Sequence, residues 1–361
     1  MSLMLNLGRS HECERSTHEC VRHLHIIEKL AEFNATWESC NNGELGSMDK
    51  VAAGETHSFA SSQADKRLGR LAFEVNHALK SRDAEAVHDL RVALRRFSQA
   101  LRVFKPCFRG KEFRKIRREA KRTLSLAGEV RNCDIALQLL AKSKQAQKAD
   151  LPLQIEARRH EAERTLVAAL RRWTDRKSSR RWRVVLETAA VKASHPSGKA
   201  SIARTAQQTL PRLAEEFFER GDRAAREKAS PAELHQFRIV SKKFRYSLEL
   251  FLPLYGPAMK PALEKIKQVQ GLLGDINDCE TVRGMISQYK GIGGVAAWLR
   301  RKQRKRIEEF QKCWLETLGT EAELRGWRAF LSRPTTKTRA VKKPAARVAG
   351  PEPLRTRAAV A

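Results

Sequence analysis

A helical segment that occurs twice constrains the fold of this chain more than any other feature. Residues 87–97 read VHDLRVALRRF, and 147 positions later residues 234–244 read LHQFRIVSKKF. A second block follows at nearly the same offset, with GEVRNCD at 128–134 and GDINDCE at 274–280. Self-similarity at a fixed offset is typical of a structural unit that is used more than once. The sequence therefore predicts two related halves.

The spacing of apolar residues is helical over most of the chain. In the first copy, the apolar side chains that recur every three or four residues are Val87, Leu90, Leu94, Phe97, Leu101 and Phe104. Such a stripe is the core-facing side of an amphipathic helix. Alternating runs typical of strands and Asn-Gly hairpin turns are lacking. We therefore expect an all-α fold of two pseudo-symmetric helical bundles, with about twelve helices and no sheet.

Two local signals refine this expectation. Ser230 followed by Pro231 is typical of an N-cap and a first helical position, so the second copy's helix should begin there. We interpret the glycine-led blocks at 128–134 and 274–280 as a turn in each half. The two helices that carry the first repeated block, one in each half, are called the signature helices below.

Charge divides the chain into three parts. Residues 1–60 carry a net charge of −4, whereas residues 333–361 carry +7 and lack an apolar period. The predicted parts are a poorly patterned extension at 1–60, one helical domain at 61–332 and a disordered basic tail at 333–361. Within the domain, a stretch rich in Ser, Pro and Gly at 194–198 separates halves of about 61–195 and 196–332.

The chain carries a net charge of +30, from 71 Lys and Arg residues against 41 Asp and Glu residues. This excess raises self-repulsion in the folded state and indicates a polyanionic partner. Aromatic residues make up 6% of the chain, which argues against binding of single strands by base stacking. Seven cysteines without CxxC spacing predict reduced thiols and a cytoplasmic location. No apolar run approaches the ~20 residues of a membrane span.

A strip of basic residues runs beside the apolar stripe of each signature helix. It comprises His88, Arg91, Arg95 and Arg102 in the first copy, and His235, Arg238, Lys242 and Arg245 in the second, flanked by Lys243. The next helix of the first half adds Arg114, Arg118, Lys121 and Arg122. A single run of this kind is usually a solvated helix face. Its repetition in both halves favours a polyanion-binding surface, although each histidine could instead have a capping or core role.

The doubled His-x-x-Arg-x-x-x-Arg/Lys-Arg/Lys pattern and the doubled glycine-led block resemble the CHAD family, the conserved histidine α-helical domain, over residues 64–331. The resemblance implies two bundles around a basic central channel that binds inorganic polyphosphate without catalysis. We expect no cofactor or metal. The expected polyphosphate ligands are His88, Arg91, Arg95, Arg96, Arg114, Arg118, Lys121, Arg122, His235, Arg238, Lys242, Lys243 and Arg245. This chain has Ser98 where the family pattern has another basic residue, and Asn132 where it has Asp.

Two other function classes use the same charge. A nucleic-acid-associated protein would bind a phosphate backbone with the basic tail and the arginine-rich segment at 158–183. A polyphosphate hydrolase is disfavoured, because no paired carboxylates with metal-ligand spacing accompany the strips. The histidines and cysteines at 11–25 match no standard zinc spacing, and whether residues 1–47 are translated stays open. The preferred chain length, oligomeric state and protein clients are open too; polyphosphate granules are the expected place for the leading function.

Overall fold

The computed structural model describes residues 53–108, 110–144, 150–192 and 202–334. These residues form α-helices and two short 3-10 turns and contain no strand, which confirms the all-α prediction. The helices are α2 (Ala53–Ser81), α3 (Ala84–Val103), α4 (Lys111–Leu140), α5 (Leu151–Asp175), α6 (Ser178–Lys192), α7 (Ile202–Ala224), α8 (Pro231–Tyr255), α9 (Met259–Ile286), α10 (Gly293–Thr317) and α11 (Glu321–Leu331). The 3-10 turns, Lys105–Cys107 and Gly256–Ala258, each follow a signature helix, α3 or α8.

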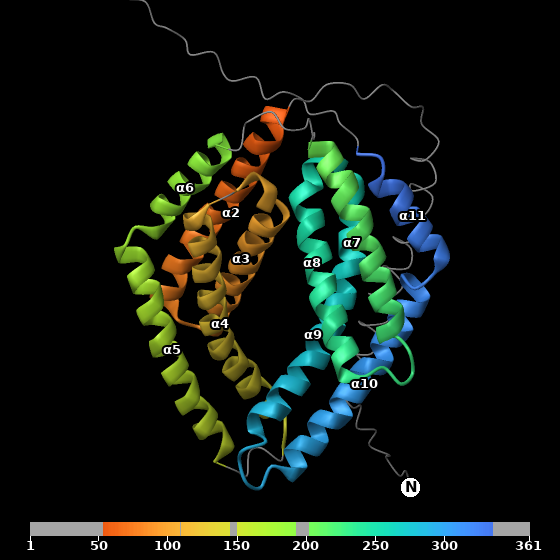
Figure 1. The fold of residues 1–361 in the computed structure, drawn as a ribbon. Coiled ribbons are helices and arrows are strands. Elements are labelled where there is room, and N and C mark those ends of the chain that lie inside the picture. Colours follow the sequence, from red (N-terminus) through yellow and green to blue (C-terminus); the bar gives the residue numbers. More distant parts are fainter. Residues whose placement is uncertain (1–52, 109, 145–149, 193–201, 335–361) are drawn as a thin grey trace, which may run out of the picture.

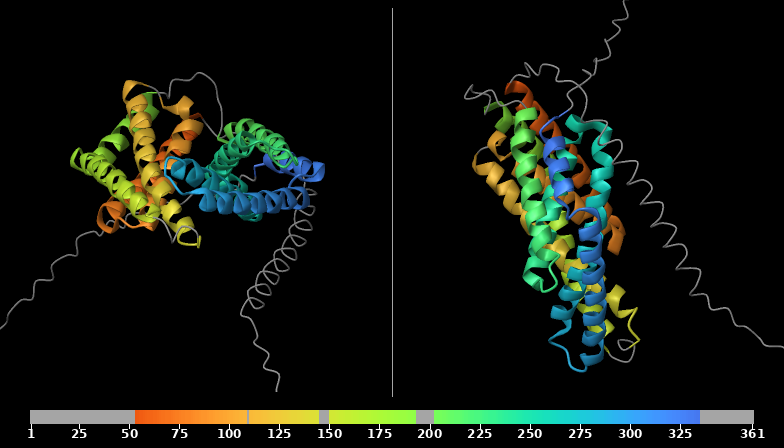
Figure 2. Two further views of the ribbon diagram at one scale, coloured as in Figure 1. Left: turned by 90° about the horizontal axis from the view of Figure 1, so that it is seen from below. Right: turned by 90° about the vertical axis from the view of Figure 1, so that its right-hand side faces the viewer.

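The helices form two groups that lie side by side (Figures 1 and 2). Helices α2 to α6 make up the first group, and α7 to α11 make up the second. Helix α3 packs against α2 and α4, and α8 packs against α7 and α9. The two signature helices also contact each other, as do α4 and α9. The two groups therefore meet along the helices that carry the repeated blocks.

Both signature helices begin at a side-chain cap. The Asp83 carboxylate accepts a hydrogen bond from the Ala86 backbone N–H at 2.7 Å. At α8, the Ser230 hydroxyl accepts from the Glu233 N–H while the Glu233 carboxylate accepts from the Ser230 N–H, and Pro231 opens the helix. Such caps satisfy backbone donors that have no partner inside the helix. The predicted start of the second signature helix is confirmed.

The apolar stripes of both signature helices are buried, as predicted, in one core that runs through both groups. Near the C-terminal ends of these helices, the Phe251 ring lies 5.8 Å from the Phe104 ring and 6.5 Å from the Phe59 ring. A few residues before Phe104 and Phe251 in their helices, the buried Gln99 amide donates a hydrogen bond to the Ser247 hydroxyl at 2.9 Å. These contacts are the first junction between the two groups.

A smaller apolar core forms a second junction, between the C-terminal parts of α4 and α9. It includes Cys133 and Leu140 from α4, and Cys279 and Val282 from α9. Cys133 and Cys279 occupy equivalent positions of the repeat, and both are buried free thiols, as predicted. Burial raises the pKa of the Cys279 thiol to about 11, which keeps it protonated near neutral pH. The groups are thus joined at two separate places.

The glycine-led blocks are not turns, and that prediction is wrong. Residues 128–134 lie inside α4 and residues 274–280 lie inside α9. Each glycine is followed by residues at helical spacing that enter a core, such as Val130 and Cys133 in α4. Burial of these side chains outweighs the ~1 kcal/mol by which glycine weakens a helix interior.

Several predictions about domain limits remain predictions. Helix α2 begins at Ala53, and Phe59 and Ala60 already pack in the main core, so the helical part reaches N-terminal of residue 61. The predicted break at 194–198, the basic tail beyond residue 334 and the segment 1–47 lie outside the described residues. Within the described part of the chain, no helix combines the length and hydropathy needed to cross a bilayer.

Packing of Trp314 against glycine gives a stability test. A Cβ added to Gly221 on α7 would overlap the indole ring of Trp314, which is buried on α10. We expect Gly221→Ala to destabilise the protein by about 1–3 kcal/mol, the usual cost of overpacking. The measurement is the free energy of unfolding in urea. Gly271→Ala, at an open helical position, is the matched control and should stabilise by about 0.5–1 kcal/mol.

Candidate polyanion-binding site

The two signature helices, α3 and α8, face each other between the two groups (Figure 1). We define the central cluster as Arg91 and Arg95 of α3, Arg131 of α4, Arg238 and Lys242 of α8, and Asp278 of α9. Charges of this cluster, from both groups, contribute to the shifted pKa values of Arg91, Arg238, Lys242 and Asp278. Two residues of each basic strip, Arg91 and Arg95 of the first and Arg238 and Lys242 of the second, are thus near one another.

Two arginines of the central cluster, Arg91 and Arg238, are costly to bury. Burial, followed by the charges of Arg95, Arg238 and Arg131, lowers the pKa of Arg91 to about 10. Burial also lowers the pKa of Arg238, against the attraction of Asp278, and its Nε atom is buried without a hydrogen-bond partner. A buried donor without a partner is normally destabilising. An anion that accepted these hydrogen bonds would relieve that cost.

Lys242 is the most perturbed cation of the cluster. Burial and the neighbouring charges of Arg238 and Arg95 lower its pKa from 10.5 to about 6, although Asp278 favours the charged form. At pH 7 most of the Lys242 amine is therefore neutral in the free protein. Because a nearby anion favours the charged form, ligand binding at this place would be accompanied by proton uptake.

Asp278 is the carboxylate of the cluster. Burial raises its pKa, although Arg238, Lys242 and Arg131 attract the charged form. Among the described residues, no carboxylate oxygen lies within 4.0 Å of a charged nitrogen of the five basic members. The cluster thus holds one acidic group and five basic ones, three of which, Arg238, Lys242 and Arg131, act directly on the Asp278 carboxyl, and it keeps a positive excess.

A glycine permits the approach of α3 to α4 at this site. A Cβ at Gly128 would lie 2.8 Å from Nη1 of Arg91, closer than real Cβ atoms come to such an atom. At the equivalent position of the second half, Gly274, no atom lies within 4 Å. The glycine of the first block therefore makes room for the Arg91 guanidinium.

Both signature histidines lie beside the second repeated block. Nδ1 of His235 is 3.1 Å from Oδ1 of Asn277. Partial burial and the charge of Arg131, the residue equivalent to Asn277, lower the pKa of His88. His88 is therefore largely neutral at pH 7 and able to donate one hydrogen bond.

Three of the predicted ligands have carboxylate neighbours instead. Nε of Arg96 is 2.9 Å from Oε2 of Glu249, which links α3 to α8. The Lys243 ammonium lies 2.6 Å from Glu216 on α7. Arg245 lies 3.5 Å from Glu249, and its guanidinium is 4.9 Å from the centre of the Tyr246 ring. The Arg96 and Lys243 contacts join α8 to neighbouring helices, whereas the Arg245 contacts lie within α8; all three leave their cations less available to a ligand.

The predicted ligands on α4 divide between two faces of the helix. Lys121 and Arg114 lie seven and fourteen residues before Gly128, so they share the strip that approaches Arg91. Arg118 and Arg122 line a different pocket, between α4 and α5. The structure therefore does not bring all four together with the central cluster.

Sequence reasoning did not select two members of the cluster, Arg131 and Asp278. Both lie in the glycine-led blocks. Because these blocks were predicted to be turns, the two residues were not assigned to a face of a helix. Treating the blocks as helix would have placed them near the signature histidines. Among the described residues, no group of three or more His, Cys, Asp or Glu side chains is arranged to hold a metal ion.

The comparisons with known proteins agree with this fold. The model of the CHAD domain family matches residues 62–287, and the chain belongs to that family. It is similar to the crystal structure of the CHAD domain from the plant Ricinus communis, with a TM-score of 0.53 and 19% identity, covering 80% of this chain and 94% of that one. It also resembles PptA from Streptomyces chartreusis, with a TM-score of 0.49 and 18% identity over 77% and 100% of the two chains. A search of curated proteins found no match.

The depressed pKa of Lys242 predicts that this residue destabilises the free protein. The unfolded chain keeps the proton below pH 10.5, whereas the folded chain loses it above about pH 6, so stability falls as the pH drops through this window. We expect Lys242→Met to raise Tm at pH 7 by about 2 °C or more and to weaken polyanion binding about tenfold. A Tm below that of the unmodified protein would contradict this account.

The glycine that accommodates Arg91 predicts a difference between two equivalent positions. Gly128→Ala should displace the Arg91 guanidinium, whose flexible end can move at little cost to stability, and should weaken polyanion binding several-fold. Gly274→Ala adds the same methyl group in open space and should leave the affinity unchanged. Both variants should keep their helicity by circular dichroism. Equal affinities for the two variants would mean that the position of Arg91 does not matter.

Proposed function

We propose that the chain binds inorganic polyphosphate, without transforming it, through the central cluster. The observation that carries the proposal is the convergence of five half-buried basic side chains from α3, α4 and α8 near one carboxylate, where the charges of the cluster shift the pKa values of Arg91, Arg238, Lys242 and Asp278. Membership of the CHAD family supports a polyphosphate-related role in general. The cytoplasm, at polyphosphate granules, is the proposed place.

The composition of the cluster suits a phosphate chain better than a nucleic acid. A phosphate polymer presents dense negative charge and no bases, so it requires cations rather than aromatic platforms. Arginine binds phosphate oxygens through two parallel hydrogen bonds, and lysine adds a compact charge. The cluster supplies four arginines and Lys242, with His88 and His235 nearby on the same helices.

The proposal assigns no chemical step to the site. Asp278 is surrounded by Arg238, Lys242 and Arg131, and its raised pKa suits a partial counter-ion. A general base for water attack would instead need access to the water and a second group to protonate the leaving oxygen. The remaining cluster members are cations that bind and orient anions.

The nucleic-acid alternative draws less support from the described residues. Within the arginine-rich segment at 158–183, Arg158 lies 3.5 Å from Glu129, Arg159 lies 2.6 Å from Asp134, and Arg183 pairs with Asp65. These three arginines therefore contribute less to a phosphate-backbone surface, whereas Arg172 and Arg176 of the same segment lie in a pocket without a carboxylate of the described residues within 4.0 Å. Direct competition between duplex DNA and polyphosphate decides between the two.

Neutralising the cluster gives the main test of function. We expect the variant R91Q/R95Q/R238Q/K242Q to bind long-chain polyphosphate at least about 100-fold more weakly, because several charge-assisted hydrogen bonds are lost. The measurement is a binding titration with labelled polyphosphate near physiological salt, with duplex DNA as competitor. Circular dichroism and Tm establish that the variant is folded.

A matched control separates the cluster from net charge. The variant R171Q/R180Q/R300Q/R301Q replaces the same number of basic side chains at exposed positions and should keep polyphosphate affinity within about threefold, because exposed charges are screened by salt. If the control lost as much affinity as the cluster variant, or if DNA displaced polyphosphate at equal phosphate concentration, the proposed function would be rejected.

A further inference from the structure

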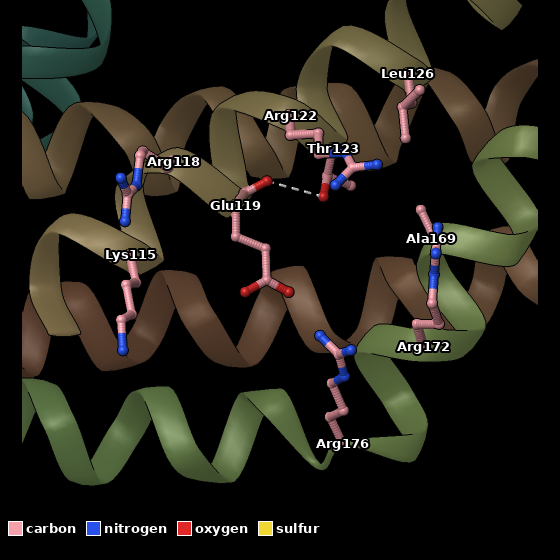
Figure 3. Close-up of a pocket in the computed structure, with 9 residues that line it drawn as sticks. All are labelled: Lys115, Arg118, Glu119, Arg122, Thr123, Leu126, Ala169, Arg172 and Arg176. Atoms are coloured by element: carbon pink, nitrogen blue, oxygen red, sulfur yellow. Dashed lines mark hydrogen bonds between the residues drawn. The ribbon is translucent and has the colours of Figure 1, made fainter.

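A second concentration of basic side chains lies between α4 and the C-terminal end of α5. It forms an open pocket of about 360 Å³, here called the outer pocket (Figure 3). The charged residues that line it are Lys115, Arg118, Glu119, Arg122, Arg172 and Arg176. The side chains come from two helices and from the corner that follows α5, so their convergence does not arise from one helix face.

The outer pocket is separate from the central cluster. On α4, Lys115, Arg118 and Arg122 follow helical three-four spacing and share one face. At ~100° per residue, Arg122 points about 120° away from Gly128, which is the point of α4 that approaches Arg91. Helix α4 therefore presents cations on two faces, and a ligand in the outer pocket would not touch Arg91.

Most cations of the outer pocket have no acidic partner. Among the described residues, no carboxylate oxygen lies within 4.0 Å of the guanidinium groups of Arg118, Arg122, Arg172 or Arg176, whereas Lys115 is 2.6 Å from Glu112. Other arginines of α5 are paired, such as Arg159 with Asp134. The four guanidinium groups are exposed to solvent, so salt screens much of their mutual repulsion. An anion held between them in the concave pocket would offset the repulsion that remains.

The corner after α5 contributes to this arrangement. Arg176 caps α5, and the next residue, Lys177, has φ of +49° in the left-handed region, which non-glycine residues seldom adopt. Glu119 extends into the pocket from α4 and faces Arg176 across it (Figure 3). It is the pocket's single acidic group.

We propose that the outer pocket binds a di- or triphosphate group, of inorganic or nucleotide origin. Five cations and one carboxylate give its lining a net charge near that needed to balance a triphosphate, which carries about four negative charges at neutral pH. Its volume lies at the small end of the ~300–1,000 Å³ range of ligand pockets. This site differs from the proposed polyphosphate site in position and in ligand size, so either can fail without the other.

The test is calorimetric titration of the full chain with inorganic triphosphate. We expect R122Q/R172Q to lose one class of binding sites, with affinity lowered about tenfold or more. The matched control R117Q/R171Q removes two exposed charges from the same two helices, outside the pocket, and should retain that class. The central-cluster variant R91Q/R95Q/R238Q/K242Q should retain it as well.

A second variant guards against loss of fold. Glu119→Gln removes the acidic group and should raise triphosphate affinity several-fold with Tm nearly unchanged. The proposal is overturned if R122Q/R172Q binds triphosphate as tightly as R117Q/R171Q, if the site class disappears in the central-cluster variant, or if Glu119→Gln has no effect. Parallel titration with ATP identifies the source: tighter binding of ATP indicates a nucleotide, and equal or weaker binding indicates an inorganic ligand.

Discussion

The apolar core shared by the two helix groups is the constraint on which the rest of the structure depends. Phe251 lies against Phe59 and Phe104 at one junction, and Cys133 and Cys279 lie in the small core at the other. Burial of these side chains fixes α3 against α8 and α4 against α9. The basic strips beside the stripes are consequently brought together, although their mutual repulsion opposes it. Hydrophobic burial thus supplies the free energy that concentrates the charge.

Periodicity made the fold and four of the six cluster residues predictable. The stripe ending at Phe104 and the cap at Ser230 follow from local rules, and both are present. Prediction from local sequence was wrong where contacts between distant segments determine the secondary structure or the partner of a side chain. Gly128 resembles a turn residue in isolation, but the packing around it keeps α4 helical and uses the missing side chain for Arg91. Nor could periodicity foresee that Arg96 faces Glu249, because that contact joins distant segments.

The two halves are related but chemically unequal. Asp278 of the second half corresponds to Asn132 of the first, and Arg131 of the first corresponds to Asn277 of the second. At each of these positions one half has a charged residue and the other half has asparagine. The site therefore contains one carboxylate among several cations, and not one carboxylate from each half. The Asp278 carboxylate offsets part of the cost of burying Arg238 and Lys242. A symmetric cluster with Asp in both halves would neutralise more of its own positive charge. A symmetric cluster with Asn in both halves would have stronger repulsion between its cations.

The buried cations also bear on how long the protein survives in a cell. Arg238 lacks a partner for its buried Nε, and Lys242 gives up its proton in the folded state, so the empty protein is less stable than its core alone would make it. Any anion that binds the folded chain shifts the folding equilibrium by mass action, and proteases act on the unfolded fraction. The steady-state amount of the protein would then follow the supply of its ligand, with no dedicated sensor.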